Sequence, residues 1–225
     1  YFLQSNMAGR PRIDKSLTAD EIAYYYTLLD EPLIDYDCGT LCRDDNNGIP
    51  YCCIADHAVP LLYKSEFSYL QKQGDLWHEW KPVTADDKEL KRSEGNDQIF
   101  CECKGVEHCV RSQRSISCRT FPLEPYIDRR GVFVGLTFLY DFTQKNPDTG
   151  KIKCPLTRRP KDFRQAGIDS HFTFWEKIML RRPDEYETYV ETSKTLRRHR
   201  DRSGRSFSIL YPSHLKNSKS AKQYI

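Results

Sequence analysis

Nine cysteines stand in a chain of 225 residues, and eight of them fall into two groups of four. The ninth, Cys154, stands alone and is followed by a proline. Thiols at this density bind metal, form disulfides, or fill a hydrophobic core, and each choice constrains the fold differently. The first group is Cys38, Cys42, Cys52 and Cys53, and the second is Cys101, Cys103, Cys109 and Cys118.

The cellular compartment of a protein determines which of these thiol chemistries is favoured. Residues 1–6 resemble an expression-tag remnant, and no apolar run near Met7 resembles a secretory signal. No stretch approaches the roughly 18 apolar residues that cross a bilayer. We therefore expect a cytoplasmic protein with no membrane partner, in which thiols stay reduced. An odd cysteine count also suits a disulfide framework poorly, so metal or iron–sulfur ligation is favoured over disulfides and scattered core thiols.

A zinc ion or an iron–sulfur cluster needs four soft ligands, and each group of four supplies them. The spacings are Cys38-x3-Cys42-x9-Cys52-Cys53 and Cys101-x-Cys103-x5-Cys109-x8-Cys118. Neither spacing is that of a zinc ribbon or of a bacterial ferredoxin. One centre with spare thiols and two centres of four ligands both stay open. The close pair Cys101–Cys103 is where we expect a spare thiol.

Two local motifs resemble a known family. The pair Cys52-Cys53 and the run Cys118-Arg119-Thr120-Phe121-Pro122 are similar to elements of the zinc- or iron-chelating cysteine-cluster family, whose signature is CxxCxxCC followed later by C-R-x-[FY]-P. Cys154-Pro155 resembles the last element of that family. Nine residues separate Cys42 from Cys52, where the family has two. The resemblance covers about residues 38–155 and implies a bound metal or cluster, with Cys52, Cys53, Cys118 and Cys154 as its best-supported ligands.

Arg119 follows a candidate ligand directly. A guanidinium beside a thiolate site lowers thiol pKa values and offsets the negative charge of a cluster, so we predict that Arg119 binds next to the cofactor. Phe121 would then shield the centre from water, and Pro122 would stiffen the chain. The alternative is that Arg119 is a surface cation and Phe121 an ordinary core ring. His57 and His108 lie near cysteines and could each replace a thiolate.

Patterns along the chain predict an α+β fold that is mostly helical, with a small antiparallel hairpin around a cysteine-ligated metal or iron–sulfur centre. Thr18 and Glu21 form a capping box before a helix with one apolar face. Arg129-Arg130-Gly131 is a turn between two strand-like segments. We expect one domain over residues 7–205 and a polar tail over 206–225. The predicted helices are 18–29, 60–73, 85–92, 161–166, 170–180 and 183–199, and the predicted strands are 123–128 and 132–142.

The sequence constrains the function of the protein less than it constrains the presence of a metal site. The net charge of +3 is too small to indicate nucleic acid, but residues 194–205 carry six basic side chains against one acid. We favour a solvated helix end there, with a nucleic-acid or protein interaction module using Arg197–Arg205 as an alternative. Some members of the resembled family are flagellin lysine N-methylases with an iron–sulfur cluster. That resemblance offers S-adenosylmethionine as a second cofactor and a methylase as an alternative activity. Catalytic residues, and any protein or small-molecule partner, stay unassigned.

Overall fold

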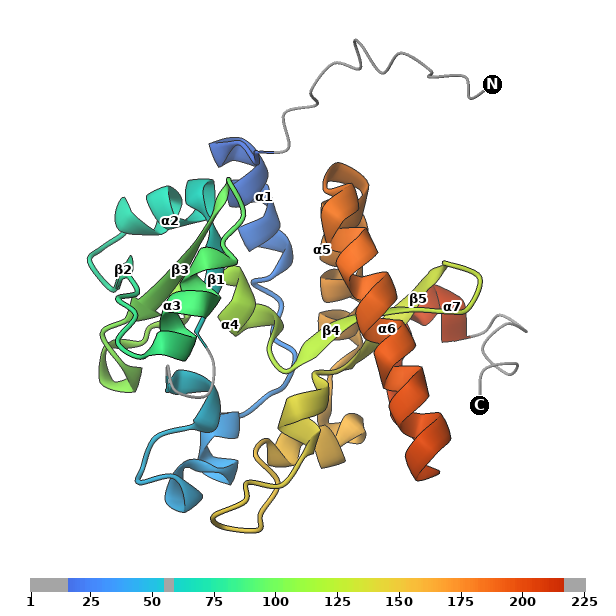
Figure 1. Cartoon of the computed structure of the whole chain (residues 1–225). Helices are drawn as coiled ribbons and strands as arrows, with labels where there is room; N and C mark the ends of the chain where they lie inside the picture. The colour runs from blue at the N-terminus through green and yellow to red at the C-terminus, as the bar shows by residue number, and fades with distance from the viewer. Residues whose placement is uncertain (1–15, 55–58, 217–225) are drawn as a thin grey trace, which may run out of the picture.

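The computed structural model describes residues 16–54 and 59–216. In that part the chain forms seven α-helices and two three-stranded antiparallel sheets, which confirms the predicted α+β class. Figure 1 shows the two sheets side by side, with α2 beside the first, α5 and α6 beside the second, and α1 between α2 and α5. The predicted tag at residues 1–6 and His57 lie outside the described residues.

Helix α1 (Ala19–Leu28) begins and buries itself as its sequence pattern predicts. The Thr18 hydroxyl accepts a hydrogen bond from the Glu21 amide at 3.1 Å, and the Glu21 carboxylate accepts one from the Thr18 amide at 2.8 Å. These reciprocal bonds satisfy two backbone donors at the helix start. One face is buried, with no side chain there more than 4% exposed: Ile22, Tyr25, Tyr26 and Leu29.

The first sheet has the order β1-β3-β2 and was not predicted. Its strands are β1 (Leu61–Tyr63), β2 (Trp77–Glu79) and β3 (Gln98–Cys103), and α3 (Ala85–Arg92) lies at the predicted bounds between the last two. The predicted helix at 60–73 was wrong at its start, because residues 61–63 pair with β3 before α2 (Lys64–Gln71) begins. This pairing buries Leu62 completely, so a non-local contact overrides the local helical pattern.

The second sheet, of order β4-β5-β6, contains the predicted hairpin. Strands β4 (Leu123–Ile127) and β5 (Phe133–Phe138) pair antiparallel around a turn at Gly131, whose φ of 80° suits glycine. Residues 209–210, which fall within the segment expected as a polar tail, form β6 and pair with β5. Helix α7 (Ser213–Lys216) follows, and α4 (Ile116–Thr120) connects the two sheets.

Two long helices cover the second sheet. Helix α5 (Gln165–Arg181) packs on α1 and β5, and α6 (Pro183–Ser203) packs on β4. The helix predicted over 161–166 was wrong: Pro160–Asp162 forms a 3₁₀ turn, and α5 begins before the predicted cap at Ser170. None of the helices described here is both long and apolar enough to cross a membrane.

Arg182, between α5 and α6, links the two sheets through a buried charge. Its side chain is 2% exposed and binds the Asp97 carboxylate just before β3 and the Asp184 carboxylate at 2.7 Å. The guanidinium also lies 5.1 Å from the centre of the Tyr63 ring in β1. A buried cation is stable only with such partners, so this contact holds α6 against the first sheet.

We predict that Arg182→Met lowers the free energy of unfolding by about 3 kcal/mol, because it leaves the partly buried Asp97 carboxylate without its counter-ion. Urea denaturation of the purified protein measures this change. Arg92→Met is the matched control, since the Arg92–Glu89 pair is more than 70% exposed on both sides. Its loss should change stability by less than about 0.5 kcal/mol. Equal effects of the two substitutions would contradict the linking role.

Candidate metal centre

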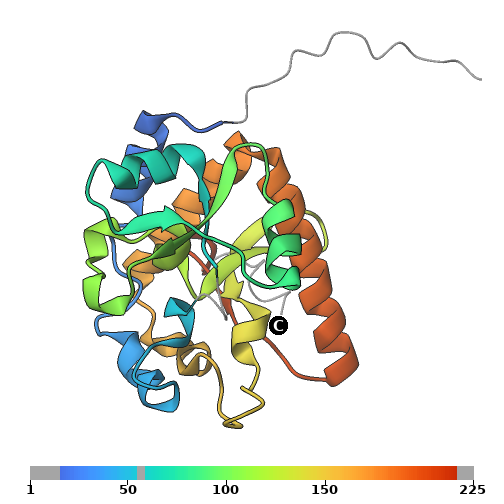
Figure 2. The ribbon, with the colours of Figure 1, turned by 60° about the vertical axis from the view of Figure 1, so that its left-hand side comes forward.

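Eight of the nine thiols come from four separate segments that meet at one end of the molecule. These are the 3₁₀ turns η1 (Cys38–Leu41) and η3 (Tyr51–Cys53), the segment from the end of β3 to α4, and the start of η7 (Pro155–Arg158). Figures 1 and 2 show the blue η1–η3 turns at this lower end, near the gold segment that carries η7. We call these residues the eight-thiol group: Cys38, Cys42, Cys52, Cys53, Cys103, Cys109, Cys118 and Cys154.

Members of this group lie near enough to one another to influence each other's pKa values. The Cys52 thiol hydrogen-bonds with Cys53, which raises the pKa of Cys52, as do burial and the charges of Cys118 and Cys38. The same hydrogen bond lowers the pKa of Cys53 to about 7, against the effect of burial. Cys154, which is distant in sequence, has its pKa raised to about 12 by burial, with a contribution from Cys38.

The spacing within the Cys52-Cys53 pair suits a shared metal ion. Their sulfur atoms lie 3.9 Å apart. Two thiolates bound tetrahedrally to one zinc at about 2.3 Å would lie about 3.8 Å apart. In the described parts of the chain, however, no three Cys, His, Asp or Glu side chains are close enough together to hold a metal ion. The donor set fits a soft metal, and four-fold ligation would require further side-chain movement.

Cys101 lies apart from the eight-thiol group. It is fully buried within β3, where burial and, to a smaller extent, the Glu66 carboxylate raise the pKa of its thiol to about 12. Its electrostatic neighbours are Glu66, Lys91, Glu79 and Glu94, and none is a thiol. Of the close pair in which a spare thiol was expected, Cys101 is therefore the one that the structure places in the core, while Cys103 faces Cys109 and Cys53.

Arg114 is the cation that lies among the thiols. Its Nε donates to the Cys109 sulfur at 3.3 Å, and its charge also acts on Cys118, Cys38 and Cys53. A guanidinium in this position stabilises thiolates and offsets the negative charge of a thiolate-ligated centre. The sequence analysis missed Arg114, although its position between two candidate ligands, Cys109 and Cys118, was a usable signal.

Arg119 has a different place from the predicted one. Its side chain is 2% exposed and pairs with Asp30 at 2.6 Å, while the guanidinium lies 4.5 Å from the centre of the Tyr26 ring. The other acceptors are backbone carbonyls at 3.0–3.4 Å, those of Leu29, Arg111, Ser112 and Arg114. Arg119 therefore fastens the loop that carries Cys109 and Arg114 to the end of α1, rather than facing the sulfur atoms.

The remaining predicted neighbours of the centre have ordinary surroundings. Phe121 packs edge-on against Phe142, with ring centres 4.7 Å apart, and adjoins the main hydrophobic core. His108 is exposed, and its charge acts on Asp75. These contacts support the core-ring alternative for Phe121 and give His108 no described contact with a thiol.

Glu66 in α2 positions α4, which carries Cys118. Its carboxylate is 1% exposed and accepts hydrogen bonds from the Ile116 amide at 2.6 Å and the Tyr26 hydroxyl at 3.0 Å. Burial nevertheless raises the pKa of Glu66 to about 7, since these donors only partly replace water. The start of α4 is thereby tied to the first sheet and to α1.

Comparison with protein-family models, with curated proteins and with solved structures finds no match to this chain. The resemblance to the cysteine-cluster family and the methylase alternative therefore stay predictions. Function has to be argued from the site itself.

The basic segment at the end of α6 is partly used inside the protein. Arg197 is buried and donates to the Ile127 carbonyl at 2.6 Å, with its guanidinium 5.6 Å from the centre of the Tyr126 ring. Arg200 binds Asp201 at 2.8 Å and packs over Phe207. The interaction module proposed for Arg197–Arg205 stays a prediction, with two of its cations already engaged in internal contacts.

We predict that Glu66→Gln changes how stability depends on pH. The folded-state pKa of about 7 lies above the ordinary value of 4.5, so the contribution of Glu66 to stability is full below pH 4.5 and is lost as the pH rises through 7. The free energy of unfolding of the native protein should therefore fall by about 3 kcal/mol relative to the variant between pH 4 and pH 8. Denaturant titrations across this range test it, with exposed Glu176→Gln as the control. If the difference in free energy of unfolding between the native protein and Glu66→Gln did not change with pH, the prediction would be contradicted.

We predict that Arg114→Met mainly affects metal affinity, whereas Arg119→Met mainly affects the stability of the metal-free protein. Losing Arg114 should reduce metal affinity about tenfold or more, because the charge next to the thiolates is gone, and should leave the metal-free protein nearly as stable as before. Losing Arg119 should lower the stability of the metal-free protein by about 3 kcal/mol or more, because buried carbonyls lose their donor. Chelator competition and denaturation, run on both variants, separate the two effects. Identical profiles would refute the division of roles.

Proposed function

We propose that this protein binds a metal ion or an iron–sulfur cluster through thiolates of the eight-thiol group. The observation that carries the proposal is the meeting of four segments, spread from Cys38 to Cys154, at one end of the fold, where their thiols influence one another's pKa values and the Cys52 and Cys53 sulfurs lie 3.9 Å apart. The core thiol Cys101 shows the contrasting arrangement, in which apolar and carboxylate neighbours replace the sulfurs.

Thiol chemistry supports a soft metal. Zinc and iron–sulfur clusters both take thiolate ligands, and each needs four. Eight thiols are enough for one centre with spare sulfurs or for two centres, and the centre would be structural or redox-active. Burial raises the pKa of Cys118 and of Cys154 to about 12, so metal binding at neutral pH would have to displace protons from them.

The charge around the group is also suitable. Four thiolates around zinc, or around an iron–sulfur cluster, leave a net negative charge in a partly buried site. Arg114 supplies a positive charge at hydrogen-bond distance from Cys109. A fixed cation of this kind stabilises the charged ligands and would tune the potential of a redox centre.

The proposal is tested by purifying the full chain without oxygen and measuring metal content and the visible spectrum. Zinc or iron bound in a fixed ratio to the protein supports it, and the spectrum distinguishes the two, because only the iron centre is coloured. A protein without metal, whose nine thiols are all free or joined in disulfides, would sink it.

We predict that Cys118→Ser and Cys101→Ser separate ligands from core thiols. Cys118→Ser should lower metal content and destabilise the metal-loaded protein by about 3 kcal/mol, a quarter of the roughly 10–16 kcal/mol that a four-ligand zinc site supplies. Cys101→Ser is the matched control: it should keep the metal and lose only packing energy. Metal analysis and thermal unfolding with and without chelator measure both. Equal metal loss in the two variants would contradict the assignment of Cys101.

A further inference from the structure

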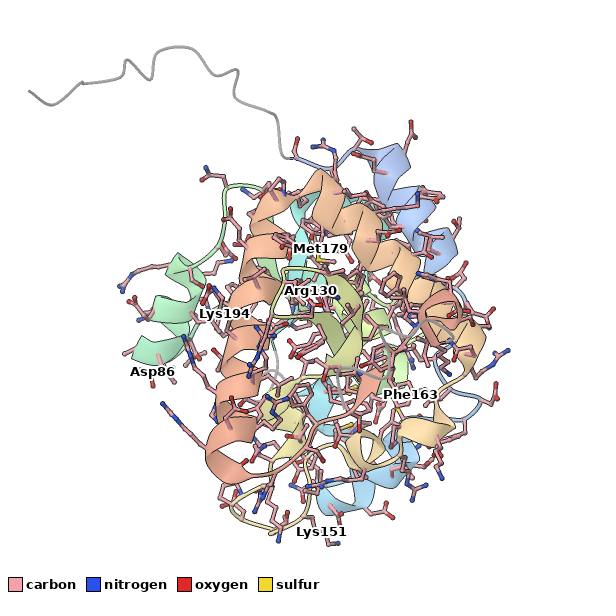
Figure 3. All side chains as sticks on the ribbon, turned by 90° about the vertical axis from the view of Figure 1, so that its right-hand side faces the viewer. Asp86, Arg130, Lys151, Phe163, Met179 and Lys194 are labelled. Atoms are coloured by element: carbon pink, nitrogen blue, oxygen red, sulfur yellow. The ribbon has the colours of Figure 1, made fainter. Side chains whose placement is uncertain are left out.

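A groove of about 730 Å³ runs along one face of α6, on elements that carry no cysteine. One stripe of α6 side chains forms its wall, and Glu124 of β4 and Tyr140 of η6 (Tyr140–Thr143) form the rest. Figure 3 looks onto the side of the molecule where α6 lies, with Lys194 labelled on that helix. The groove is therefore a feature separate from the eight-thiol group.

Glu124 is the unusual residue in this groove. It belongs to a strand whose five residues are all buried, and it is itself only 6% exposed. Across the residues that the structure describes, its carboxylate makes no hydrogen bond or ion pair, in contrast to Glu66 with its three donors. A carboxyl group with so little exposure favours its neutral form unless a cation pairs with it.

Negative charges near Glu124 disfavour its ionised form further. Asp141 of η6 adds a second negative charge, and with burial it raises the pKa of Glu124 to about 8. Glu187 and Glu191 lie along the α6 wall, with Glu191 held by Lys194 at 2.6 Å. The basic side chain in the lining, His199, is stacked on Tyr140 with ring centres 4.2 Å apart. This field repels anions and attracts a cation.

The shape and lining of the groove select among cations. Tyr140, Leu196 and the methyl groups of three threonines offer apolar surface beside the carboxylate. An organic cation with an apolar stem matches both the Glu124 carboxyl group and the apolar walls.

We propose that the groove on α6 binds an alkylammonium group, with the Glu124 carboxylate as its buried counter-ion and Tyr140 and Leu196 against its alkyl stem. Two sources carry this chemistry: a free diamine, and the end of a lysine side chain in a peptide. Both would place the ammonium at Glu124 and direct the remainder of the molecule along the acidic wall of α6. The site contains no cysteine, so this proposal can be tested independently of the proposed metal centre.

Calorimetric titration of the full chain at pH 7 with 1,5-diaminopentane and, separately, with the peptide acetyl-Gly-Lys-Gly-amide tests the proposal and distinguishes the sources. Whichever probe binds should lose about tenfold or more in affinity with Glu124→Gln, which keeps the side-chain size and removes the charge. Glu89→Gln, on the exposed face of α3, is the control and should bind as the native protein does. Circular dichroism checks that both variants stay folded.

A second readout follows from the raised pKa. Binding of the cation should draw the proton from Glu124, so the heat of binding at pH 7 should change with the ionisation enthalpy of the buffer. The groups facing Glu124 are Asp141 from η6, Tyr189 from α6, and the Tyr140–His199 stack, and their contribution is measured by repeating the titration in the Glu124→Gln variant. No binding of either probe at 10 mM, equal binding to Glu124→Gln, or equal binding of butyrate would overturn the proposal.

Discussion

The buried guanidinium of Arg119 is the contact on which the end of the molecule with the thiols depends. One side chain joins the last turn of α1, the loop before α4, and the Tyr26 ring in the core. Its donors are directed mainly to backbone carbonyls, so they replace the water that those groups lose. The loop between β3 and α4 has little regular structure of its own. The contacts of Arg119 therefore fix the conformation of this loop and, with it, the direction of the Arg114 side chain.

A second buried cation does the same work between the sheets. Arg182 joins the start of α6 to the loop before β3, much as Arg119 joins α1 to the loop before α4. The apolar content of 38% leaves a lean core, and these two residues show where polar contacts supplement it. Glu66 is the anionic counterpart, because it fastens α2 to α4 through backbone and hydroxyl donors. Ion pairs and capping bonds thus decide how the layers meet, while apolar packing fills each layer.

Local signals in the sequence predicted the elements that local forces specify. The capping box at Thr18 and the turn at Gly131 act within a few residues, so α1 and the β4–β5 hairpin could be predicted. Strand β3 could not, because Gln98–Cys103 has little apolar alternation and is held by partners on both sides. Strand β1 was hidden for the same reason within an apparent helix.

At the candidate site, too, local sequence signals could not predict which side chains the fold brings together. Arg119 was chosen because it follows Cys118, but successive residues of a helix point about 100° apart, so Arg119 faces away from the sulfur of its neighbour. Arg114 reaches the thiols from before the start of α4. Cys101 and Cys103 lie two residues apart in a strand, which is about 7 Å, enough to leave one in the core and bring the other to the thiols. Cysteine number and family-like motifs pointed to the site, and the tertiary fold divided its members.

The spread of the eight-thiol group along the chain also has a consequence for biosynthesis. Cys154 reaches the group only after both strands of the β4–β5 hairpin have been made, whereas Cys38 to Cys53 leave the ribosome much earlier. The early thiols therefore spend that interval without their late partners, open to oxidation and to mispairing. Under the proposed function, a metal or cluster would be loaded only after most of the chain has been translated, and the nascent thiols would have to stay reduced until then.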